Sequence, residues 1–251
     1  MTAAPSLHAR DGERTSNATL RDRVSTTWRR GRGSRALPLL AALLLPIPFL
    51  LVAHQLYFWD IGPFDSPRWA VNSDRSFIEI FGYLQLAAAV VLLLLLWARH
   101  RRGLFAGSWA VVLAVVVLDD SLRLHERGGA ALVDRGAVPS GLGLPAQALG
   151  ELAVWAALGV AIVILLALVY RASDPADRFD SRWLAGLMLL LVFFGVGVDV
   201  AHEVVEELTD NSVVDLLVTF VEAGGELAAM STLLVFVVHM SRRSTSRSST
   251  S

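Results

Sequence analysis

The sequence has 251 residues, of which 54% are hydrophobic, and its formal net charge is −1. A mean hydropathy of +0.54 is too high for an ordinary soluble domain and places the chain in the membrane class. The chain has no cysteine, which excludes disulfides, thiolate metal sites and thiol catalysis. Arginine supplies every basic charge; without lysine, a Schiff-base lysine is excluded.

Six apolar runs occupy most of the chain. As helices, they are each long enough to cross the roughly 30 Å hydrocarbon core of a bilayer. The runs cover residues 37–58, 76–98, 104–124, 146–170, 183–207 and 214–240. We therefore expect an all-α, polytopic membrane bundle of six transmembrane helices within residues 36–240. Pro46 and Pro48 predict a kink in the first helix.

Polar segments lie on both sides of this region and between its helices. Residues 1–35 are rich in Ser, Thr and Arg without periodicity, so we expect a disordered tail, and we expect the same of residues 241–251. The longest internal link, residues 127–145, is rich in Gly and Pro, which is typical of a loop that covers a site.

The positions of the arginines predict the orientation. With the amino terminus inside, 17 arginines fall in inside segments and 5 in outside segments. This bias follows the positive-inside rule. We therefore expect a multi-pass plasma-membrane protein with both termini in the cytoplasm.

With this orientation, the acids in or next to the apolar runs are expected in the outer half of the bundle. At about 100° per residue, Asp199, His202 and Glu203 share one stripe of the fifth helix. Glu222 and Glu226 form an i,i+4 pair on the sixth helix, and Gly224-Gly225 between them predict the close approach of a neighbouring helix. A charge near the bilayer centre costs roughly 2.5–3.5 kcal/mol, so these acids need compensation.

We expect a divalent metal ion to balance the negative charge of these acids. Carboxylates and imidazoles without thiols suit Zn, Fe or Mn. We expect Glu222 and Glu226 to act as a catalytic base or as further ligands. The expected metal ligands come from several helices and are His202, Asp199, Glu203, His125, Asp119, Asp120 and Glu151.

Structural interpretations of some of these residues stay open. Asp119 and Arg123 are four residues apart and have the spacing of a self-neutralising ion pair. His125 points away from Asp119 if this helix stays regular. His54 lies beside Tyr57 and Phe58 and is also typical of an aromatic belt at the membrane surface.

The helices also pair as three hairpins with similar features. His54, His125 and His202 precede Glu79, Glu151 and Glu226 by 25, 26 and 24 residues. This spacing predicts three tandem hairpin repeats with a site at their interface. Chance likeness among helices rich in Leu, Val and Ala is the alternative.

Three classes of function fit these features. The first is a metal-binding membrane protein, which as an enzyme would be a hydrolase or oxidoreductase acting on a lipid or another small apolar substrate in the bilayer. The second is a proton- or cation-coupled transporter, which the almost purely apolar inner halves of the helices disfavour. The third is a non-enzymatic sensor or assembly partner. No motif for nucleotides or nucleic acid is present.

Overall fold

The computed structural model describes residues 36–73, 75–99, 102–141, 144–208 and 212–246. Among these residues there are helices and no strands, and six segments are long and apolar enough to span a membrane. The predicted six-span, all-α membrane bundle is therefore confirmed. The predicted tail at residues 1–35 lies outside the described residues, as do residues 247–251 of the predicted tail at 241–251, whereas residues 241–246 continue the last helix. The six segments are Ala36–Phe58, Phe77–Ala98, Gly103–Leu122, Ala146–Ala172, Pro175–His202 and Ser212–Ser244.

The first span is divided into α2 (Ala36–Leu44) and α3 (Pro46–Phe58). The helix is interrupted at Leu45, directly before Pro46, because a proline has no N–H for the helical ladder and its ring crowds the preceding turn. The interruption lies where the kink was predicted. The second span is the single helix α4 (Phe77–Ala98). Its amino terminus is capped by the Ser76 hydroxyl, which accepts a hydrogen bond from the Glu79 N–H.

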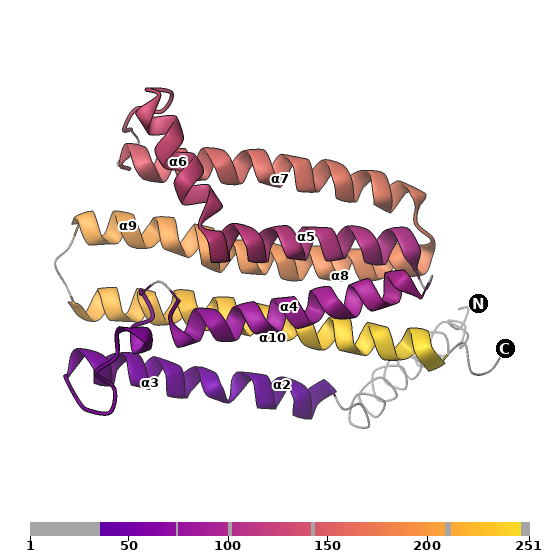
Figure 1. Cartoon of the computed structure of the whole chain (residues 1–251), viewed down its shortest axis with the longest axis horizontal. Coiled ribbons are helices and arrows are strands. Elements are labelled where there is room, and N and C mark those ends of the chain that lie inside the picture. Colours follow the sequence, from indigo (N-terminus) through magenta and orange to yellow (C-terminus); the bar gives the residue numbers. More distant parts are fainter. Residues whose placement is uncertain (1–35, 74, 100–101, 142–143, 209–211, 247–251) are drawn as a thin grey trace, which may run out of the picture.

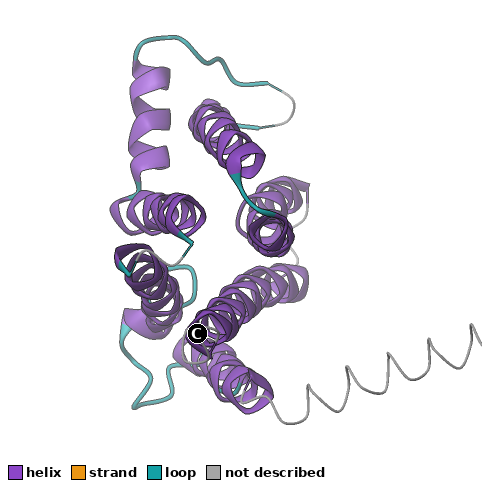
Figure 2. Ribbon diagram, turned by 90° about the vertical axis from the view of Figure 1, so that its right-hand side faces the viewer, coloured by secondary structure: helices purple, strands orange, loops and turns teal. Residues whose placement is uncertain are grey.

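The third span ends earlier than expected. Helix α5 (Gly103–Leu122) stops at Arg123, whose φ of 53° is left-handed, and α6 (Leu124–Asp134) begins immediately afterwards. Residues 127–145 were predicted as a loop, and this was wrong as far as Asp134. Figure 2 looks along the bundle and shows α6 lying across the direction of the other helices.

The fourth span is α7 (Ala146–Ala172), and the fifth begins eight residues before the predicted 183, at α8 (Pro175–Val192). Asp174 caps α8, and Pro175 suits its first turn. A π-helical segment, η2 (Phe193–Val198), joins α8 to α9 (Asp199–Leu208). The sixth span is α10 (Ser212–Ser246), which continues beyond the predicted end at 240.

The two ends of the bundle differ, as Figure 1 shows. At one end lie α6, α9 and the start of α10; we call it the α6 end. At the other end α4 finishes and α5 begins; we call it the Arg102 end. Between them, α4, α5, α8 and α10 contribute side chains to a dry core, while other large apolar side chains face outward, as lipid contact requires. Core side chains with no exposure include Leu93, Leu113, Leu184, Leu233 and Val237.

Candidate functional site

A cavity of about 520 Å³ lies at the α6 end and is partly open to the surface. Its walls come from α4, α5, α6, α7, η2, α9 and α10, together with the segment before α4. Most of the residues predicted to form the site meet in this one cavity, although they are far apart in sequence. Those that line it are Asp120, His125, Glu151, Asp199, His202, Glu222 and Glu226.

The remaining predicted residues have other positions. Asp119 is only 3% exposed and does not line the cavity. The backbone of Glu203 belongs to α9, but its side chain lies outside the described part of the structure. His54 is buried and accepts a hydrogen bond from the Val71 N–H (2.9 Å). It therefore ties the segment after α3 to that helix, and it does not line the cavity with His125 and His202.

The break at Arg123 determines where His125 points. A regular helix would carry His125 away from Asp119, but the left-handed Arg123 turns α6 back over the end of α5. His125 Nδ1 lies 2.9 Å from Asp119 Oδ2 as a result. Arg123 pairs with Glu126. Asp119 therefore orients a histidine that faces the cavity. The Asp119–Arg123 pair stays a prediction.

Two glycines allow α6 to cross α7 closely. A Cβ on Gly129 would lie 2.8 Å from the Glu151 backbone nitrogen, and one on Gly150 would lie 2.8 Å from the Gly129 carbonyl oxygen. Across this contact, Gln147 Nε2 donates to the Glu126 carbonyl (3.0 Å) and to Glu151 Oε1 (2.7 Å). The glycine contact thus holds one group of cavity side chains in place.

A second group surrounds His202 on the opposite wall. His202 Nδ1 lies 3.1 Å from Glu222 Oε2, and Nε2 lies 2.7 Å from Asp215 Oδ1. Both ring nitrogens therefore have a carboxylate partner. Sequence reasoning missed Asp215, although it lies seven residues before Glu222 and so on the same face of a helix.

The π-helical segment brings Glu226 against the fifth span. Gly195 lies directly opposite the Glu226 carboxylate, and Gly225 lies against the Phe194 ring. A side chain on either glycine would occupy the space of its partner, which confirms the close approach predicted at Gly225. π-Helical turns of this kind occur frequently at functional sites.

The cavity has far more acidic than basic side chains. Two histidines and Arg123 face eight carboxylates across it. Glu226 lies near four other acids, among them Asp199 and Glu222. Within the described residues, no three or more His, Asp or Glu side chains are already placed to hold a metal ion. The eight carboxylates are Glu79, Asp120, Glu126, Glu151, Asp199, Asp215, Glu222 and Glu226.

Acids are also buried at the Arg102 end, contrary to the expectation that they gather only in the outer half. Asp177 and Asp180 are 8% and 5% exposed and pair with arginines there. Sequence reasoning missed them because it took residues 171–182 to be a polar link. The motif Asp174-Pro175, a helix cap followed by a first-turn proline, is the signal that would have moved the helix start.

Comparisons with known proteins identify a family for this chain. No curated protein and no solved structure matches the chain. A family model described as a domain of unknown function (DUF8692) matches residues 36–240. These residues include all the cavity-lining residues and nearly all of the six spans. Because the match covers most of the chain, the protein belongs to this family.

Proposed function

We propose that the protein is a membrane-embedded cation-binding protein and that a divalent metal ion binds in the cavity at the α6 end. One observation carries this proposal: eight carboxylates line a single cavity with only two histidines and one arginine. At an effective dielectric constant of about 20, one opposite charge at 4 Å contributes roughly 4 kcal/mol. A bound cation therefore offsets the mutual repulsion of these acids.

The chemistry of the donors fits a divalent metal. Asp199, Glu222 and Glu226 offer oxygen donors, and His202 offers nitrogen. Oxygen and imidazole donors without sulfur suit Mn, Fe or Zn. Because both His202 nitrogens already have carboxylate partners, binding through this ring requires Asp215 or Glu222 to rotate away. Binding through the acids alone requires only side-chain rotation.

Metal-dependent catalysis is an extension of this proposal. A bound metal would supply Lewis-acid or redox chemistry, and Glu222 or Glu226 would accept a proton from a substrate or water at the cavity. The substrate class is a lipid or another small apolar molecule, because the walls of the cavity belong to helices that face the bilayer. In this form the protein is a hydrolase or an oxidoreductase.

Cation-coupled transport is the second candidate. The same cavity would then be a transport site, and its carboxylates and histidines suit proton or cation relays. Fully buried apolar side chains such as Leu93, Leu113 and Leu233 separate the cavity from the Arg102 end. Transport therefore requires a second arrangement of the bundle in which this layer opens.

The test is to measure metal in the purified, full-length protein and then to titrate the metal-free protein with Mn²⁺, Fe²⁺ and Zn²⁺. We expect saturable binding of at least one ion. Glu226→Gln and His202→Ala should each lower the affinity about 10-fold or more, since each removes a donor or its partner. Asp134→Asn is the matched control, because it removes one acid from α6 outside the cavity.

Two results would contradict the proposal. One is the absence of saturable binding for all three metals in protein that is folded by circular dichroism. The other is an affinity that falls equally in Asp134→Asn and in Glu226→Gln, because the effect would then come from net charge and not from the cavity. Cation flux into vesicles that contain the protein distinguishes transport from binding alone.

A further inference from the structure

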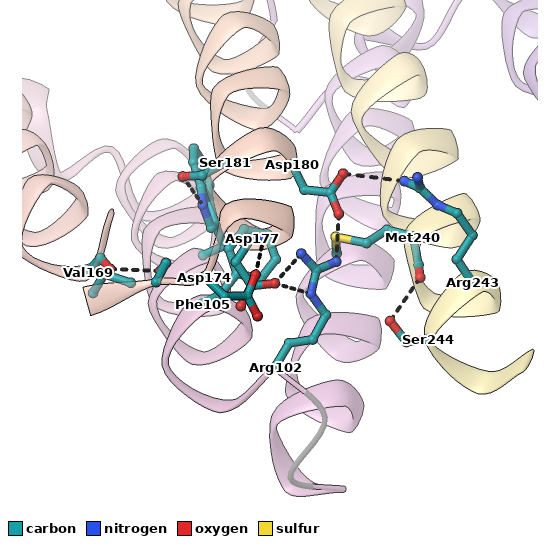
Figure 3. Close-up of polar contacts among 12 residues, drawn as sticks. Arg102, Phe105, Val169, Asp174, Asp177, Asp180, Ser181, Met240, Arg243 and Ser244 are labelled. Atoms are coloured by element: carbon teal, nitrogen blue, oxygen red, sulfur yellow. Dashed lines mark hydrogen bonds and ion pairs between the residues drawn. The ribbon is translucent and has the colours of Figure 1, made fainter. Parts of the chain in front are cut away.

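A network of ion pairs joins three helices at the Arg102 end, as Figure 3 shows. Arg102, which precedes α5, donates from Nη1 to Asp180 Oδ2 at 2.7 Å and also pairs with Asp177, so it holds two acids of α8. Arg243 of α10 donates to the other oxygen of Asp180 at 3.3 Å. Asp180 is therefore shared between α5 and α10.

The network borders a cavity instead of closing a dry core. This second cavity measures about 330 Å³ and is lined by Arg102, Asp177, Asp180 and Arg243. Buried ion pairs are seldom more stabilising than well-packed apolar side chains of similar size, because removing charges from water is costly. Such networks are better suited to fixing or switching an arrangement than to adding stability. Helices held together by such ion pairs can separate when water hydrates the charged groups.

The connection between α5 and α8 depends on side chains. The two helices contribute side chains to the same buried apolar core, among them Trp109 from α5 and Leu184 from α8. They are joined by Arg102 and, one level deeper, by the Trp109 Nε1–H, which donates to the Ser181 hydroxyl at 3.1 Å. Separating α8 from α5 at the Arg102 end therefore breaks these polar contacts.

The apolar side chains that separate the two cavities lie directly behind these ion pairs. Phe105 packs under the Arg102 guanidinium at 4.4 Å, and Trp109 is 1% exposed. Beyond them, Leu113 and Leu233 are fully buried between the two cavities. Movement of α8 away from Arg102 would thus admit water to the interior from the Arg102 end.

We propose that Arg102, Asp177, Asp180 and Arg243 form a releasable ion-pair latch that holds the Arg102 end of the bundle closed. Among the described residues, a closed latch leaves the α6 end as the side from which the acidic cavity is reached. Release of the latch opens the interior from the opposite end. The latch does not depend on cation binding, so its test and the metal titration fail independently.

The sequence contains no cysteine, so a cysteine introduced by substitution can be labelled selectively. A single reporter, Ser181→Cys, is placed in the full-length protein, because Ser181 is 8% exposed and lies behind the latch. The reporter is labelled with a water-soluble maleimide in protein reconstituted into vesicles. We expect slow labelling with the latch intact, and labelling at least about 10-fold faster when Arg102→Gln is added.

Matched variants separate release of the latch from general loosening. Arg178→Gln removes an arginine at the same end that bonds only backbone carbonyls within the described residues, and it should leave the labelling rate unchanged. Arg102→Lys, which keeps the charge but loses the two-pronged pairing, should give an intermediate rate. A second reporter, Ser231→Cys, sits in the dry interior between α4 and α10 and measures unfolding.

Three results would overturn the latch. One is labelling of Ser181→Cys that is equally fast with and without Arg102→Gln. Another is an equal acceleration by Arg178→Gln, which would make the effect one of surface charge. The third is an equal acceleration at Ser231→Cys, which would mean that loss of Arg102 unfolds the bundle and that the network is only structural.

Discussion

The contact between Gly129 and Gly150 gives the most direct test of how the acidic cavity is built. In Gly129→Ala the new Cβ would lie 2.8 Å from the Glu151 nitrogen, 2.9 Å from Glu151 Cγ and 3.1 Å from the Gly150 carbonyl carbon. Ordinary contacts between carbon atoms lie near 3.5–4.0 Å, so α6 must move from α7 by roughly 0.5–1 Å. Two of these three atoms belong to the backbone and cannot rotate away.

The loss of stability expected in Gly129→Ala comes from overpacking of the contact between α6 and α7. Forcing an extra methyl group into a closely packed contact costs about 1–3 kcal/mol. Alanine is otherwise favoured over glycine in a helix by about 1 kcal/mol. Gly159→Ala is the matched control, because its Cβ would meet no atom within 4 Å and it lies in the same helix as Gly150. We expect Gly129→Ala to be less stable than Gly159→Ala by about 1–3 kcal/mol.

Unfolding in detergent, followed by the loss of helical circular dichroism, measures this difference. Cation affinity should also fall in Gly129→Ala, because moving α6 stretches the Gln147 bridge between Glu126 and Glu151. Equal stability and equal affinity in Gly129→Ala and Gly159→Ala would refute the view that this contact positions the cavity wall.

Two further predictions concern buried polar residues. Asp119→Asn should lower cation affinity about 10–100-fold if His125 holds the ion, because a residue that orients a metal ligand typically contributes this much to the affinity. Unchanged affinity in the same titration would show that His125 does not hold the ion. Gln85→Leu combined with Ser231→Ala should leave stability unchanged or raise it, since Gln85 Nε2 is buried without a partner among the described residues. A loss of more than about 2 kcal/mol in detergent unfolding would contradict this.

Hydropathy predicted the spans because a stretch of about 20 apolar residues has few alternatives to crossing a membrane. It could not predict the break at Arg123. A left-handed, non-glycine residue is uncommon and has no sequence signal here, so both α6 and the His125–Asp119 pair were hidden. The start of α8 at Pro175 was visible in the sequence but was passed over because Asp177 and Asp180 made the segment look like a polar link.

The meeting of acids from distant parts of the chain was partly predictable. Glu79, Glu151 and Glu226, which occupy equivalent positions in the predicted hairpin repeat, all line one cavity. His54, the first histidine of the same repeat, does not line it and bonds the Val71 backbone instead. The repeat therefore stays a prediction, and spacing alone could not distinguish a structural histidine from those that face the cavity.

The contrast between the two ends of the bundle is the strongest physical reason to expect a cation. At the Arg102 end, the buried acids Asp177 and Asp180 are neutralised by arginines, so the chain supplies its own compensation. At the α6 end, a larger group of acids shares a cavity with one arginine, which is itself paired with Glu126. We therefore expect the excess acids at the α6 end to be compensated by bound protons or by a cation from solution, and we propose the cation. The proposal of a metal site rests on this imbalance.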